Sequence, residues 1–173
     1  IFPSGQSSYT GECTIIPPGI EKLLKMLGAP VVRLHIQGAH LCYPKWDRSK
    51  IRKTKVQVTA TPLLSAGQIR AMSPSQVYDA VADALTFDDY EWQRNARLAS
   101  RKPRSAEGLQ KVLYQCPKCQ SEFTMEAHGN RLYCARCGNG ALMDEYGFLQ
   151  KETDESVVFD TPVKWHRWQM ELL

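Results

Sequence analysis

The sequence has no long hydrophobic run, no leader-like beginning and no strong charge of either sign. No apolar stretch approaches the roughly 20 residues that a membrane-spanning helix needs, and no signal peptide is visible. The net charge is only +4, so total charge does not indicate a class of partner. Internal repeats and low-complexity tracts are absent as well. The 173 residues, 43% hydrophobic and 23% charged, are ordinary globular material, enough for one domain and a small appendage.

An initiator methionine is also missing at the start. The chain opens on Ile1 and Phe2 and runs directly into the turn-forming residues Pro3, Ser4 and Gly5. A natural N-terminus is usually polar and frayed, whereas this one is typical of a buried strand that enters a tight turn. We therefore expect the strand to belong to a sheet that begins upstream, and the chain to be the C-terminal part of a larger protein.

The first 85 residues or so follow the order helix, strand, strand, helix. Ile20, Leu23, Leu24 and Leu27 lie on one face of a predicted helix, and Gly28 stands where a helix-ending glycine belongs. Apolar runs predict strands at 30–38 and 55–63, and helical spacing predicts helices at 73–85 and 88–100. This order predicts an α/β fold.

The helix predicted at 73–85 carries its own start signal. Ser73 stands at the N-cap, Pro74 at the first helical position and Gln76 at the third, which together form a capping box. Another helix start is predicted at Thr161 and Pro162 near the C-terminus.

Two stretches are locally basic. The first carries a run of cations against the single acid Asp47: Lys45, Arg48, Lys50, Arg52, Lys53 and Lys55. The second spans 94–104. Such stretches suit phosphate groups, membrane surfaces or acidic partners, and each is equally compatible with a solvated basic face.

Four of the six cysteines form two pairs with the pattern C-x2-C-x14-C-x2-C: Cys116, Cys119, Cys134 and Cys137. Each C-x2-C forms a tight knuckle, and the hairpin predicted between the pairs brings the four sulfurs to one tetrahedral site. Such a site is closed to water and favours a structural zinc ion. Two disulfides would need an oxidising compartment, and a rubredoxin-like iron site remains an alternative. Cys13 and Cys42 lack partner spacing and are interpreted as buried thiols.

These signals divide the chain into four parts. Residues 1–100 form the main α/β portion, and the Pro-, Ser- and charge-rich residues 101–112 form a linker. Residues 113–150 form a small β zinc ribbon, and 151–173 form a C-terminal strand and helix that dock on the main domain.

The main portion resembles the glycerolipid acyltransferase family, the lysophosphatidate acyltransferases and their relatives. The family's third motif, a Gly-led amphipathic helix and a Val-Pro-Val-type strand correspond here to FPSGQSS, PGIEKLLKMLG and APVVRLHI, in the same order and spacing. The resemblance implies that residues 1–100 are the C-terminal half of a mixed-sheet domain.

The resemblance also implies an activity. Members of the family move an acyl group from a thioester, acyl-coenzyme A or acyl carrier protein, to a lysophospholipid or other glycerolipid hydroxyl in phospholipid biosynthesis. Their general base lies in a His-x4-Asp motif, which this chain lacks. We therefore expect the motif upstream, no catalytic residue in residues 1–173 and no activity from this chain alone. The resemblance further implies a cytoplasmic enzyme, peripheral to the cytoplasmic membrane.

The resemblance places acceptor binding at the opening turn. The expected substrate-binding residues are Pro3, Ser4, Gly5, Ser7, Ser8 and Arg33. Ser4 replaces the family's glutamate, Ser7 its phosphate-binding arginine, and Arg33 the proline of its fourth motif. We expect Arg33, or a cation between Lys45 and Lys55, to hold an acceptor phosphate instead.

Two other functions remain for the ribbon itself. Zinc ribbons with basic flanks often bind RNA or DNA, and others bind a protein partner or support the sheet. The predicted hairpin carries the balanced set Glu122, Glu126, Arg131 and Arg136. We therefore expect a structural or protein-binding role, and nucleic acid is not an expected partner.

Overall fold

The computed structural model describes residues 1–47, 52, 54–100 and 106–173, which divide into two compact units interleaved along the chain. The first unit comprises Ile1–Ser8, Glu12–Gln37 and Gln57–Phe87, and the described part of 9–11, 38–56 and 88–173 forms the second. Both units combine helices with antiparallel strands, which confirms the α/β class at this level. The domain boundaries predicted from the sequence stay a prediction.

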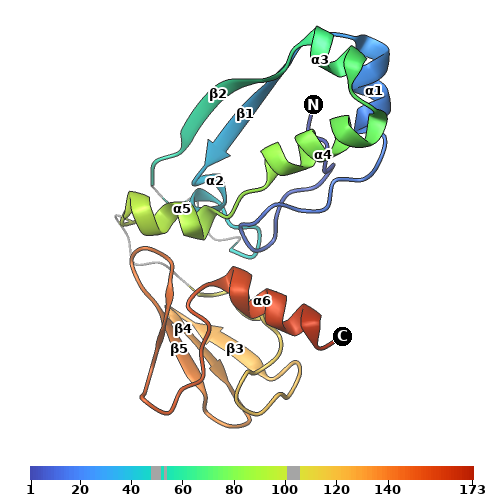
Figure 1. Cartoon of the computed structure of the whole chain (residues 1–173). Coiled ribbons are helices and arrows are strands. Elements are labelled where there is room, and N and C mark those ends of the chain that lie inside the picture. The colour runs from blue at the N-terminus through green and yellow to red at the C-terminus, as the bar shows by residue number, and fades with distance from the viewer. Residues whose placement is uncertain (48–51, 53, 101–105) are drawn as a thin grey trace. The chain divides into compact units, whose positions relative to one another are not determined.

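The first unit packs its helices around a small apolar core (Figure 1). Its elements are α1 (Ile20–Leu27), β1 (Val31–Gln37), β2 (Gln57–Leu64), α3 (Ala66–Ala71) and α4 (Pro74–Leu85). Leu24 of α1 and Val77 and Val81 of α4 are buried together with Leu64 and Ile69, so the predicted helical stripes do supply the core.

Local sequence signals set the helix ends in this unit. The Ser73 hydroxyl accepts from the Gln76 N–H and the Gln76 side chain accepts from the Ser73 N–H, so the predicted capping box begins α4. Gly28 ends α1 in the left-handed conformation, as predicted, and its N–H donates to the Leu24 carbonyl. These bonds satisfy main-chain groups that a helix end leaves without partners.

β1 and β2 form a two-stranded antiparallel sheet with one apolar, solvent-exposed face. Leu34 lies opposite Ala60 and Ile36 opposite Val58, and Leu34 and Val58 are 60% and 59% exposed. The side chains of the other face alternate with these, and Arg33 and His35 belong to that face. The mixed sheet implied by the resemblance stays a prediction, because the strands described here pair only in antiparallel fashion.

The second unit is built around a four-stranded antiparallel sheet in the order β3-β4-β5-β6. Its elements are α2 (Ala39–Cys42), α5 (Asp89–Ala96), the 3-10 helix η1 (Leu109–Lys111), β3 (Met125–His128), β4 (Arg131–Cys134), β5 (Gly140–Met143), β6 (Leu149–Lys151) and α6 (Pro162–Glu171). The strands β3 and β4 are the hairpin predicted between the two cysteine pairs.

The core of this unit includes residues on both sides of the cysteine pairs. Ala106 and Leu109 fall within the predicted linker, yet both are fully buried among the ribbon's apolar side chains. Residues 101–105 of that linker lie outside the described residues. Trp165 of α6 is fully buried in the same cluster, and Val163 of α6 contacts Leu41 and Tyr90. The C-terminal helix is therefore integrated into the second unit.

Two predicted helices have different outcomes in this unit. α6 begins as predicted, with the Thr161 hydroxyl accepting from the Lys164 N–H. α5 ends at Ala96, four residues earlier than predicted, where Arg97 adopts a left-handed conformation. The buried Gln93 side chain bonds the main chain of Leu98 beyond that end. Among the helices described, none is long and apolar enough to cross a membrane.

Candidate metal centre

The two cysteine pairs lie in two loops with the same backbone structure. The first loop precedes β3 and carries Cys116 and Cys119; the second joins β4 to β5 and carries Cys134 and Cys137. In each loop the N–H of the residue four positions after the first cysteine donates to that cysteine's carbonyl, at 2.9 Å in both. These donors are Gln120 and Gly138, both in the left-handed conformation.

A second hydrogen bond repeats in both knuckles. Cys116 donates its N–H to the Ser121 carbonyl at 3.0 Å, and Cys134 donates its N–H to the Asn139 carbonyl at 2.8 Å. In each case the acceptor lies five residues further along the chain. The two loops are therefore the pair of knuckles that the C-x2-C spacing predicts, each with its main chain internally satisfied.

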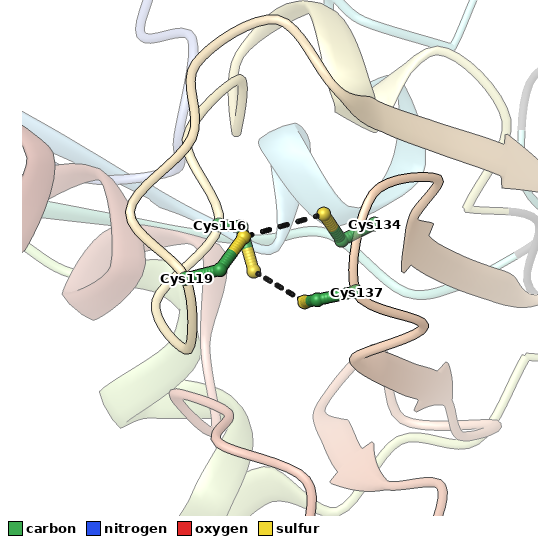
Figure 2. A group of neighbouring side chains, drawn as sticks. All are labelled: Cys116, Cys119, Cys134 and Cys137. Carbon is green, nitrogen blue, oxygen red and sulfur yellow. Dashed lines mark hydrogen bonds between the residues drawn. The ribbon is translucent and has the colours of Figure 1, made fainter.

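The four sulfurs converge between these loops (Figure 2). All four Sγ atoms lie within 4.8 Å of one another. Cys116 and Cys137 are 3.6 Å apart and Cys119 and Cys134 are 3.8 Å apart, measured between sulfurs. The cysteines are free thiols, since a disulfide would bring two sulfurs to about 2.05 Å.

The sulfur geometry fits a tetrahedral metal site. With metal–sulfur bonds of about 2.3 Å, the sulfurs of a regular tetrahedron stand about 3.8 Å apart. Cys119 and Cys134 are at this separation and Cys116 and Cys137 are close to it. The four residues therefore form a cluster that can bind a metal ion such as zinc.

Two hydroxyl groups lie against the sulfurs. The Ser121 Oγ is 3.0 Å from the Cys119 sulfur, and the Thr124 Oγ1 is 3.3 Å from the Cys134 sulfur. The two hydroxyls are 2.8 Å apart. Sequence reasoning missed both; their positions two and five residues after Cys119 are the only signal of them.

The surroundings shift the thiol pKa values in opposite directions. Burial raises the pKa of Cys116 to about 12. Burial acts in the same sense on Cys134, but hydrogen bonds from Thr124 and from the main chain of Cys137 and Arg136 outweigh it and lower its pKa to about 6. Because cysteines ligate as thiolates, a metal must displace at least the Cys116 proton at neutral pH.

The cations expected to offset the thiolate charge lie at the surface of the knuckles. Lys118 and Arg136 are both exposed, and Lys118 pairs with Glu155 at 3.8 Å. Neither side chain occupies a ligand position. The site is therefore closed by four sulfurs alone, which is the arrangement of structural zinc sites.

The opening turn forms near the N-terminus of the first unit. The Gly5 N–H donates to the Phe2 carbonyl at 3.0 Å, and Gly5 has a φ of +65°. Ser4 donates its hydroxyl to the Gln6 carbonyl, and Ser7 is exposed. Pro3 and Ser8 are half-buried. The assignment of these residues to substrate binding stays a prediction.

The cations expected to hold an acceptor phosphate are engaged within the protein. Arg33 donates from Nη1 to the Ala84 carbonyl at 2.8 Å. Arg52 forms a buried ion pair with Asp47, at 2.9 Å. Lys45 stands over the Tyr9 ring, and Lys55 is exposed. Arg48, Lys50 and Lys53 lie outside the described residues.

Comparisons of this chain with known protein families, with curated proteins and with solved structures find no match.

Proposed function

We propose that Cys116, Cys119, Cys134 and Cys137 hold one structural zinc ion, and that this ribbon is part of a glycerolipid-type acyltransferase. The observation that carries the first half is the sulfur geometry, with separations of 3.6 and 3.8 Å between sulfurs from opposite knuckles. Four thiolates favour zinc or iron, and a closed tetrahedron supplies a cross-link rather than a reaction centre. Bound zinc would join two loops that are 14 residues apart in sequence.

The zinc half of the proposal is tested by metal analysis of the purified protein. We expect about one zinc per chain, bound by four sulfurs at ~2.3 Å in X-ray absorption. Cys116→Ser should lose the metal and unfold the ribbon, because metal binding supplies much of such a unit's folding free energy. Cys13→Ser is the matched control, since Cys13 is a free thiol of the first unit. Iron in place of zinc, or a metal-free folded ribbon, contradicts the proposal.

The acyltransferase half is supported by local structure at the three segments of resemblance. Phe2 and Gly5 close a turn, Gly19 directly precedes α1, and the strand β1 follows α1 after a short turn. The proposed reaction is attack of a glycerolipid hydroxyl on a thioester carbonyl, with loss of the thiol from acyl-coenzyme A or acyl carrier protein. The base that accepts the hydroxyl proton would lie in a His-x4-Asp motif upstream of Ile1.

Within this proposal the opening turn contacts the acceptor headgroup. Gly5 is exposed, and an added Cβ would meet no atom within 4 Å, so the turn leaves open space beside it. The main-chain N–H groups and the hydroxyls of Ser4, Ser7 and Ser8 are the proposed donors. A membrane surface that presents the glycerolipid is the proposed location of the reaction.

Activity of the longer polypeptide that carries this chain tests the turn. Gly5→Val should abolish thiol release from an acyl-thioester donor in the presence of a lysophospholipid. Gly28→Val is the matched control, because Gly28 has the same kind of positive φ, +58°, and the same open space in the same unit. Equal loss in both variants assigns the effect to backbone strain and contradicts the binding role. Turnover by residues 1–173 alone contradicts the upstream base.

A further inference from the structure

The C-terminal helix α6 holds the main chain just before the first cysteine knuckle. The Trp165 Nε1–H donates to the Gln115 carbonyl at 2.9 Å. The Gln115 N–H donates to the Gln169 Oε1 at 3.2 Å, and the Gln169 Nε2 donates to the Val112 carbonyl at 3.0 Å. Two side chains of one helix thus bind three main-chain groups of the segment that leads into Cys116.

These contacts lie in the interior of the second unit. Trp165 and Gln169 are fully buried, and Gln115 is 8% exposed. A glutamine in such a position is uncommon, and water cannot easily replace its partners once they are buried. Loss of either side chain would leave main-chain donors or acceptors unsatisfied, so these bonds fix the position of Gln115.

Gln115 connects this anchor to the metal ligands. It directly precedes Cys116, which is fully buried in the same apolar cluster as Trp165. The Gln115 side chain donates to the Gln120 carbonyl at 3.2 Å, and the Gln120 N–H donates to the Cys116 carbonyl. An unbroken series of bonds therefore runs from α6 through Gln115 around the first knuckle.

We propose that α6 is a working part of the metal centre, with Trp165 and Gln169 as positioning residues that preset Cys116 for the ion. The inference rests on the proposed zinc site and extends it to a helix that begins 25 residues after the last cysteine. Groups that orient metal ligands from the next layer outward commonly change metal affinity 10- to 100-fold when they are removed. By linkage, the bound ion must strengthen the docking of α6 by the same factor.

The test measures zinc release from the full chain into an excess of a chromogenic chelator. Gln169→Met keeps the side-chain length and removes the hydrogen bonds, and Trp165→Phe removes the indole donor. Gln93→Met is the matched control, since Gln93 is also fully buried and donates from Nε2 to the Leu98 and Tyr146 carbonyls, apart from the knuckles. We expect about tenfold faster release from Gln169→Met and Trp165→Phe, and wild-type release from Gln93→Met.

Hydrogen exchange on the wild-type protein gives a reading that needs no variant. Removal of zinc should speed exchange of the amides of α6 at least tenfold while those of α4, in the other unit, stay unchanged. A wild-type protein that binds no zinc contradicts the metal centre itself. A protein that binds one zinc, yet releases it equally fast from Gln169→Met and Gln93→Met and keeps α6 protected without zinc, overturns the role of α6 alone.

Discussion

Arg33 of β1 donates from its Nη1 to the carbonyl of Ala84, in the last turn of α4, at 2.8 Å. The side chain crosses from the strand to a helix end whose carbonyls carry partial negative charge, where a guanidinium is favourable. Arg33 thus joins two elements that are 51 residues apart in sequence. Its proposed contact with an acceptor phosphate would have to compete with this bond.

Arg33→Ala should lower the free energy of unfolding by about 1–2 kcal/mol, because a hydrogen bond to a charged, half-buried donor is lost. Urea unfolding followed by circular dichroism measures the change. Arg70→Ala is the control, since Arg70 is exposed on α3, and it should change stability by less than about 0.5 kcal/mol. Equal effects of the two substitutions would contradict the structural role of Arg33.

Arg33 also affects the titration of His35. Burial, and then the positive charge of Arg33, lower the pKa of His35 below its usual 6.5. The native state therefore disfavours the protonated ring, so this contribution to stability is present above pH 6.5 and is lost as the pH falls through 6.5 toward the lower native pKa. Arg33→Ala should raise the His35 pKa in an NMR titration, and Arg70→Ala should leave it unchanged. A His35 pKa at or above 6.5 in the wild-type protein contradicts this prediction.

Asp47 and Arg52 form an ion pair that is almost fully shielded from water. Their side chains are 5% and 8% exposed, and the Arg52 guanidinium stands 4.7 Å from the centre of the Trp46 ring. Asp47→Asn removes the negative partner and leaves a buried positive charge, so we expect a loss of about 3–5 kcal/mol in the free energy of unfolding.

Denaturant unfolding followed by tryptophan fluorescence measures the loss at Asp47. The comparison is Glu91→Gln, which breaks the exposed ion pair between Glu91 and Arg94 and should cost less than about 1 kcal/mol. If Asp47→Asn costs no more than Glu91→Gln, the pair does not stabilise the second unit, and Arg52 becomes available again as a phosphate ligand.

Gly38 is required by both its backbone angle and its surroundings. Its φ is +80°, and an added Cβ would stand 2.8 Å from the Lys55 carbonyl oxygen and 2.8 Å from the Trp92 ring. Gly38→Ala should therefore lower the melting temperature. Gly67 is the matched control: it lies in α3, and the nearest atom to an added Cβ is 3.9 Å away. Gly67→Ala should raise stability by about 0.5–1 kcal/mol, and a similar gain from Gly38→Ala would contradict the packing described.

Much of the local structure is predictable from the sequence because its causes are short-range. The capping box of Ser73 and Gln76 and the helix-ending Gly28 act within one turn of chain, and both form as predicted. The spacing of Cys116, Cys119, Cys134 and Cys137 likewise indicates two knuckles, and the four sulfurs do converge. The resemblance to acyltransferases stays a hypothesis about the first unit, to be tested on the longer polypeptide.

By itself, then, the sequence determined the helices with clear stripes and caps, the β3–β4 hairpin and the metal-binding cysteines. The tertiary structure alone decided that Ala106 and Leu109 enter the ribbon core, that Arg33 faces α4 and that Gln169 of α6 binds Gln115. The physical reason is the same for each. Whether a polar or linker-like residue is buried depends on partners that are distant in sequence, and no local pattern of side chains records where those partners will lie.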